Sequence, residues 1–285
     1  MPEHTHRKTR TGVLAVLLAA LTSPAAVLAG PEEDRQAFVD FFQGQFPDIP
    51  FDEFVNGIYA IDADARAQWM EIEEFPPYEF AIERGEALWL EPFANGSTYA
   101  DCYEQPVGEI RAAYPQFDAA RAEVVTLELS INDCRAANNE LPLEYDASDM
   151  IDLSSHLAFA ARGKKIDVQI PEDAPGALEA YEAGKSFYYS KRGQLNFACA
   201  DCHVTSVGLR VRADRLSASL GHPTHFPVYR SKLGGMISLQ QRFIGCVRDV
   251  RAKPFELQSP EYRTLEFFLA YMSNGLTING PGARK

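Results

Sequence analysis

The segment Cys199-Ala200-Asp201-Cys202-His203 places two thiols and an imidazole within five residues. This C-x-x-C-H spacing is the attachment signature of c-type haem: two thiols on one helical turn reach the two vinyl groups, and the imidazole lies beneath the iron. A C-x-x-C redox pair or half of a zinc site could use the same thiols. A zinc site needs a second ligand pair, however, and the chain has no other C-x-x-C. We therefore expect one covalently attached haem c.

The N-terminus has the three-part layout of a secretory signal peptide. Three basic residues precede the apolar run 13–21, and Val27-Leu28-Ala29 offers a cleavage site of small residues. A polar break at 22–24 interrupts the run well short of a bilayer span, which argues against a membrane anchor. We expect residues 1–29 to be removed near Ala29 and the mature chain to be periplasmic, in an oxidising compartment where disulfides persist.

The charge of the chain is strongly acidic, with 27 Lys and Arg against 40 Asp and Glu, a net charge of −13. Removal of residues 1–29 takes away three basic residues and one acidic residue, which leaves −15. This balance argues against a nucleic acid or an anionic membrane as partner. The stretch 210–253 is nevertheless locally basic, opposed only by Asp214 and Asp249, as an anionic substrate would require.

The chain also reads as a duplication of one mainly helical unit. At one and the same offset, Cys134 matches Cys246 and Gly163 matches Gly275, with helical apolar faces before each glycine. At a slightly shorter offset upstream, Gly85 and Cys102 parallel Gly184 and Cys202. Alternating β-branched runs are scarce, so an extended sheet is not expected.

The two copies are expected to meet in the proline-bracketed acidic linker near 164–175. The sequence therefore predicts a first domain over 30–167 and a haem domain over 168–285, both mainly α-helical. The stretch 30–77 reads as an N-terminal extension of the first domain.

The ligand on the second face of the iron is not decided by spacing. The residues downstream of the haem motif that could supply it are His222, His225, Met236, Cys246 and Met272. Met272 lies in the apolar stripe of the last expected helix, which favours packing. The two histidines flank a proline in a turn-rich loop, where surface or substrate-side roles are as plausible as ligation. An unpaired thiol at Cys246 in an oxidising compartment indicates a role as a metal ligand or as a reactive cysteine.

Several motifs beyond C-x-x-C-H carry a family resemblance. They are QRFIGC at 241–246, SPEY at 259–262, LAYMSNG at 269–275 and INDCR at 131–135. In combination they resemble the A subunit of the SoxAX cytochromes of bacterial thiosulfate oxidation. The resemblance implies two cytochrome-c-like domains in tandem, with haem only in the second, and His203 and Cys246 as axial ligands. It also implies that Cys246 is the active cysteine, found as a persulfide, and that Arg242 contacts the substrate.

The residues agree with that role for Arg242, since Arg242 and Cys246 are neighbours at i and i+4 if the segment is helical. A guanidinium there would lower the thiol pKa and hold a sulfur oxyanion through paired hydrogen bonds.

The sequence departs from the diheme members of the family. Cys102 is followed by Tyr103-Glu104-Gln105 rather than by a C-x-x-C-H motif, so the chain resembles the monohaem type. Cys102 falls at the lost attachment position and Cys134 at the duplicated position of Cys246. We expect these two cysteines to form a disulfide that staples the domain without haem.

The activity that the resemblance implies is an L-cysteine S-thiosulfotransferase. Such an enzyme couples thiosulfate oxidatively to a cysteine of the carrier protein SoxYZ, and a cytochrome subunit, SoxX, leads the electrons away. Two other readings stay open. One is a plain periplasmic electron-transfer cytochrome, which would use a Met or His ligand and leave Cys246 dispensable. The other is a thiosulfate dehydrogenase that makes tetrathionate, although those enzymes resemble diheme proteins.

Overall fold

The computed structural model describes residues 30–212 and 214–285, together with Met1. Apart from Met1, the expected signal peptide lies outside the described residues. The described part is mainly helical, and its largest sheet has only three strands, as the scarcity of alternating runs predicts. Within these residues, no helix combines the length and apolar character needed to cross a bilayer.

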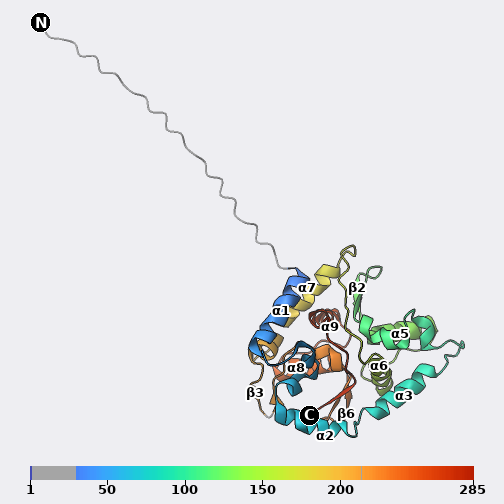
Figure 1. Ribbon diagram of the computed structural model, residues 1–285. Coiled ribbons are helices and arrows are strands. Elements are labelled where there is room, and N and C mark those ends of the chain that lie inside the picture. The colour runs from blue at the N-terminus through green and yellow to red at the C-terminus, as the bar shows by residue number, and fades with distance from the viewer. Residues whose placement is uncertain (2–29, 213) are drawn as a thin grey trace.

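Two groups of helices divide the molecule, as Figure 1 shows. On one side lie α3, α5 and α6, and on the other lie α7, α8 and α9, with α1 beside α7. The elements of the first side are α3 (Glu79–Leu90), η2 (Tyr99–Cys102), α4 (Val107–Ile110), η3 (Arg111–Ala113), β1 (Gln116–Asp118), β2 (Glu123–Val125), α5 (Leu127–Ala137) and α6 (Ser148–Ala160).

The second group continues the chain through the haem motif. Its elements are α7 (Ala177–Tyr189), η4 (Asp201–Thr205), β3 (Arg210–Val211), β4 (Asp214–Arg215), η5 (His222–His225), β5 (Val228–Arg230), β6 (Gly235–Ile237), α8 (Leu239–Asp249), α9 (Pro260–Met272) and β7 (Gly282–Arg284). Here β3 pairs with β4, while β5 lies between β6, which is antiparallel to it, and β7, which is parallel to it.

The same succession of elements occurs twice, and the repeat distance is the one found in the sequence. The hairpin β1–β2, α5 and α6 recur later in the chain as β5–β6, α8 and α9, each displaced by the offset that relates Cys134 to Cys246. Even the helix caps repeat, because the hydroxyl of Thr126 accepts from the amide of Leu129 as that of Ser238 accepts from Gln241. Gly85 and Gly184, which the sequence comparison matched, also share one role in packing.

Each group is built on a pair of helices that cross at a glycine. A β-carbon at Gly85 of α3 would lie 1.9 Å from the backbone oxygen of Asp152 in α6, and one at Gly184 of α7 would lie 2.1 Å from that of Thr264 in α9. No side chain larger than hydrogen fits at that distance, so the glycines permit the close crossing.

The N-terminal segment packs differently from the sequence expectation. It contains α1 (Pro31–Gln45), η1 (Phe51–Ala60) and α2 (Ala63–Glu73). Phe42 and Phe54 are buried in the core of the second group, and Asp34 binds the ammonium of Lys185 on α7. The sequence assigned 30–77 to the first domain because of chain order, but chain order does not decide which apolar surface covers another. The segment instead contributes η1 and α2 to the wall of the cavity that contains the haem motif.

Candidate functional site

The haem-motif residues face a large cavity in the second group of helices. Cys199, Cys202 and His203 lie on and just before η4, a short π-helical segment, and the carboxylate of Asp201 accepts from the amide of Ala198 at 2.8 Å. The cavity encloses about 710 Å³ and is lined by residues of η1, α2, α7, α8 and the sheet around β5. A volume of this size lies within the range of cofactor and ligand pockets.

The orientation of His203 leaves one ring nitrogen available as a ligand. Its Nδ1 lies 2.9 Å from the backbone oxygen of Ser217, which can only accept, so Nδ1 carries the proton and donates. Nε2 is then unprotonated, as metal-binding histidines require, and the carbonyl fixes the plane of the ring. Burial lowers the pKa of His203 to about 4, so the ring is neutral at physiological pH.

Three free thiols meet in this cavity. Cys199, Cys202 and Cys246 are unpaired, all three line the wall, and Cys246 is an electrostatic neighbour of both other sulfurs. Burial raises the pKa of Cys199 to about 12. Cys199 is therefore a protonated thiol at physiological pH and not a reactive thiolate. The structure therefore brings the haem motif and the lone cysteine of the sequence analysis to one place.

Cys246 and Arg242 lie on the same helix, α8, four residues apart. Ser238 is the N-cap of this helix and forms a capping box with Gln241. A β-carbon at Gly245 would lie 3.2 Å from Nη1 of Arg242, so the guanidinium rests against the small residue next to the thiol. Burial nonetheless raises the pKa of the Cys246 thiol, because desolvation outweighs the opposing pull of Arg242 and Arg230. Arg242 thus lowers the thiol pKa, as the sequence predicts, but burial raises it by more, so the net shift is upward.

The other candidate ligands divide between the cavity and the core. His222 lies beside His203, with ring centroids 4.6 Å apart, and its Nε2 is 2.9 Å from the hydroxyl of Ser217. It therefore belongs to the His203 side of the cavity. His225 also lines the cavity, and its buried Nδ1 has no hydrogen-bond partner among the described residues.

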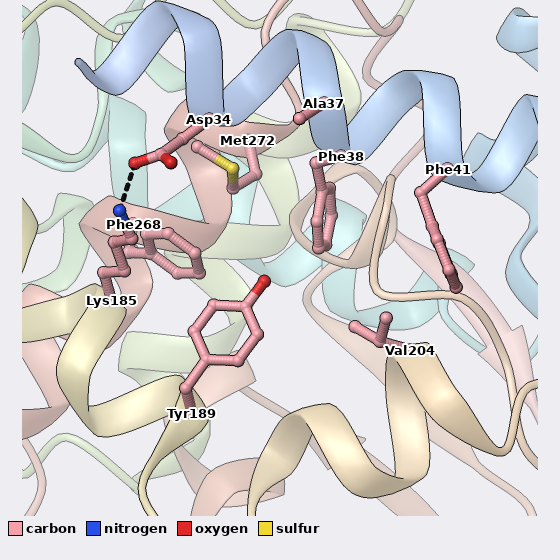
Figure 2. A pocket seen from close by; sticks show the side chains of 9 residues that line it. All are labelled: Asp34, Ala37, Phe38, Phe41, Lys185, Tyr189, Val204, Phe268 and Met272. Carbon is pink, nitrogen blue, oxygen red and sulfur yellow. Dashed lines mark hydrogen bonds and ion pairs between the residues drawn. The ribbon is translucent and has the colours of Figure 1, made fainter. Parts of the chain in front are cut away.

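Neither methionine candidate lines this cavity. Met236 lies on β6, and Met272 is 1% exposed in the core, as packing at that position predicts. Met272 borders a separate pocket of about 230 Å³ between α1 and α7, shown in Figure 2, where Asp34 reaches Lys185 near Phe268. That pocket contains neither a thiol nor an imidazole among its lining residues.

Comparison with known proteins gives consistent matches. The family model described as "SoxA/TsdA, cytochrome c domain" matches residues 84–166. A relative from Allochromatium vinosum, named "L-cysteine S-thiosulfotransferase subunit SoxA", is 52% identical over 95% of this chain and 96% of its own length. One of the same name from Chlorobaculum tepidum is 48% identical over 96% of each chain.

The chain belongs to the SoxA family of L-cysteine S-thiosulfotransferase subunits. Its fold agrees with this membership, since it resembles the solved structure described as "Crystal structure of SoxXA from P. pantotrophus" with a TM-score of 0.69 and 31% identity. That match covers 79% of this chain and 84% of the other. The mainly helical, cytochrome-c-like fold expected from the sequence is thereby confirmed.

The part of the chain that matches the cytochrome c model contains no C-x-x-C-H motif. Within it, Cys102 and Cys134 are joined by a disulfide. Tyr103, at the position that corresponds to His203, has its hydroxyl 3.0 Å from that of Ser130. Trp89 stacks on Tyr99 with centroids 5.7 Å apart, and both are buried in the core of the first group of helices. Aromatic side chains therefore occupy the interior beside the disulfide.

Sequence reasoning missed residues that contribute to the candidate site. Ser217 acts through its backbone oxygen, which leaves no signal in residue identity. Arg230 belongs to the basic stretch noticed in the sequence, but Arg284 lies outside it, on β7. The pairing of β5 with β7 sets these two arginines opposite each other, and only the tertiary fold reveals it.

Proposed function

We propose that a single haem c is attached through Cys199 and Cys202, with His203 and Cys246 as the two axial ligands of its iron. The observation that carries this proposal is the convergence of these four side chains, from the haem motif and from α8, on one cavity. When bound, the haem supplies an iron that exchanges single electrons and coordinates a thiolate.

The residues present fit such a group. The cavity has the volume of a cofactor pocket, and His203 has its Nε2 free because Nδ1 donates to Ser217. Arg192, His225 and Arg284 each line the cavity and each have a buried nitrogen without a partner among the described residues. Buried polar atoms of this kind are normally satisfied, so their number argues for a polar ligand in this space.

The reaction is the oxidative coupling of thiosulfate to a cysteine of the SoxYZ carrier protein. A bond forms between the carrier sulfur and the outer sulfur of thiosulfate, giving a cysteine S-thiosulfonate, one proton and two electrons. Cys246 is the residue that interacts with the outer sulfur of thiosulfate, as a thiolate or persulfide. Arg242 holds the anionic sulfonate end through charge-assisted hydrogen bonds. The two electrons leave through the haem subunit SoxX, a partner that the similarity to the SoxXA structure supports.

Two tandem domains are the architecture we propose, the first over 30–167 without haem and the second over 168–285 with haem, and the N-terminal segment of the first packs against the second. The repeated succession of helices and strands and the two glycine crossings support the duplication. The disulfide supports the loss of haem from the first domain: it joins directly the two positions that correspond to Cys202 and Cys246. The periplasm is the proposed location, with residues 1–29 as the export signal.

Replacement of Cys246 by alanine tests this function. We expect thiosulfate-dependent turnover with the carrier protein to fall to background and the optical spectrum to lose its thiolate-ligand bands. Replacement of the exposed Arg248 on the same helix by alanine is the matched control and should leave both unchanged. If turnover and spectrum both survive in the Cys246→Ala protein, the plain electron-transfer cytochrome is the better interpretation.

A further inference from the structure

Two arginines lie opposite each other on neighbouring strands in the wall of the cavity. Arg230 on β5 is in register with Arg284 on β7, so both side chains project from the same face of the sheet. Both line the cavity. Arg284 is 7% exposed and Arg230 is half-buried, so two positive charges are largely withdrawn from water at one place. Burial and mutual repulsion lower the pKa of Arg284 to about 10, and burial also lowers that of Arg230.

Neither arginine forms an ion pair with a carboxylate in residues 30–212 and 214–285. Arg284 donates from Nη1 to the backbone oxygen of Ala283 at 2.8 Å, and its Nη2 is buried without a partner. Its guanidinium lies over the ring of Tyr59, 4.8 Å from the centroid. That contact supports the cation but accepts no hydrogen bond in the plane of the guanidinium.

Carboxylates that act on these arginines or line the same cavity have other partners. Glu73 accepts from the indole of Trp69 at 2.7 Å, from the hydroxyl of Tyr78 and from the amide of Ala283. Asp62 pairs with Arg215 at 2.6 Å, and Asp214 pairs with Lys232. A buried charge without a partner is strongly unfavourable. The pair Arg230–Arg284 therefore has the properties of a site that receives an anion from outside the chain.

The position of the pair in the cavity identifies the chemical class of that anion. The groups that most affect Cys199 and Cys202 electrostatically are Cys246, Arg192, Asp201 and Arg242. Those of Arg284 are Tyr59, Glu73 and Arg230. The two attachment thiols therefore share none of these neighbours with Arg284, although Arg230 also acts on Cys246. Haem attached through its vinyl groups carries its two propionates on the opposite half of the macrocycle. A carboxylate on a guanidinium fork is the strong, two-bonded pairing expected there.

We propose that Arg284, with Arg230 beside it, is the anchor for a propionate carboxylate of the haem. His225, whose buried Nδ1 has no partner among the described residues, lies next to this anchor and provides a further polar contact. The inference rests on the proposed attachment of haem at Cys199 and Cys202. In this proposal the C-terminal strand β7 contributes to haem binding through Arg284, in addition to the attachment by the haem motif.

The test is the reduction potential of the haem-loaded chain, measured by optical redox titration from about pH 6 to about pH 9, a range that spans the titration of a freed propionate. In the Arg284→Gln protein we expect a more negative potential, because loss of a nearby positive charge favours ferric iron. We also expect a new fall of the potential with rising pH, because burial without the guanidinium raises the pKa of the freed propionate into this range, where it titrates. Arg284→Lys keeps the charge and should therefore retain most of the wild-type potential and pH response.

Three comparisons make the outcome decisive. The exposed Arg248→Gln on α8 removes the same charge away from the cavity and should leave potential and pH response as in the wild type. Arg230→Gln provides a second variant at the same site if Arg284→Gln does not fold. A purely structural role of Arg284 would lower stability without a new pH response, and that result would overturn the proposal. Absence of covalently bound haem in the wild type would instead contradict the proposed function itself.

Discussion

Gly184 on α7 lies so close to α9 that a β-carbon at this position would be 2.1 Å from the backbone oxygen of Thr264. The close packing of α7 and α9, the helix pair that positions the haem motif, therefore requires glycine at this position. We expect Gly184→Ala to lower the free energy of unfolding by about 3 kcal/mol, because the helices must separate or the backbone must shift. Denaturant titration of the variant measures this loss.

Gly44 on α1 is the matched control, since it is exposed and a β-carbon there would meet nothing within 4 Å. Gly44→Ala should leave stability unchanged or raise it by up to about 1 kcal/mol through the reduced freedom of the unfolded chain. Equal stabilities of the Gly184→Ala and Gly44→Ala proteins would show that the helix crossing is not tightly packed.

The disulfide between Cys102 and Cys134 closes a segment with a sequence separation of 32 residues. A loop of that length restricts the unfolded chain by about 3–4 kcal/mol. We expect the double replacement of both cysteines by serine to lose about that much stability, with little change in the haem spectrum. Thiol titration of the denatured, haem-stripped wild type should show no free thiol in this half. Two additional free thiols there would contradict the disulfide.

Glu266 on α9 is 5% exposed and accepts from the side-chain amide of Gln240 at 3.0 Å. Burial, with Glu128 nearby, raises the pKa of Glu266 from 4.5 to about 8, although Arg111 pulls it down. Between pH 4.5 and about pH 8 the folded chain holds a proton that the unfolded chain releases. This group therefore stabilises the fold less as pH rises through that window.

Glu266→Gln should remove this dependence, since the amide stays neutral and can still pair with Gln240. We expect the variant to match the wild type at about pH 4 and to exceed it by on the order of 2 kcal/mol at about pH 8. Buried histidines titrate in the same window with the opposite sign, so the quantity to measure is the difference between the two proteins. A difference that does not change with pH would mean that Glu266 is ionised in the fold.

Arg242 rests against Gly245 on the same helix as Cys246. Arg242→Gln should lower kcat/KM for thiosulfate by about 10- to 100-fold, because a charge-assisted hydrogen bond to the anion is lost. Gly245→Ala should cause a smaller loss, since its β-carbon displaces the guanidinium by only a few tenths of an ångström. Steady-state turnover with the carrier protein measures both. Arg248→Gln, exposed on the same helix, should retain full activity.

Most of the chemistry of the candidate site could be predicted from the sequence. The C-x-x-C-H motif, the spacing of Arg242 and Cys246, and the repeat that relates Cys134 to Cys246 are local or periodic signals. Each depends only on residue type and distance along the chain. The helical crossings at Gly85 and Gly184 follow from the same duplication, because duplicated glycines keep the same packing role. The packing of α1 and η1 on the second group was not predictable, since neither segment belongs to the repeat.

By itself, the sequence determined which residue types are available: two thiols and an imidazole for haem, a lone cysteine with an arginine one helical turn away, and two cysteines free to pair. Only the tertiary structure decided how they are held. The ring of His203 is oriented by a backbone oxygen of Ser217, and every residue has such an oxygen. Arg230 and Arg284 meet because β5 and β7 pair as parallel strands, a contact between distant segments that arises only when the chain packs.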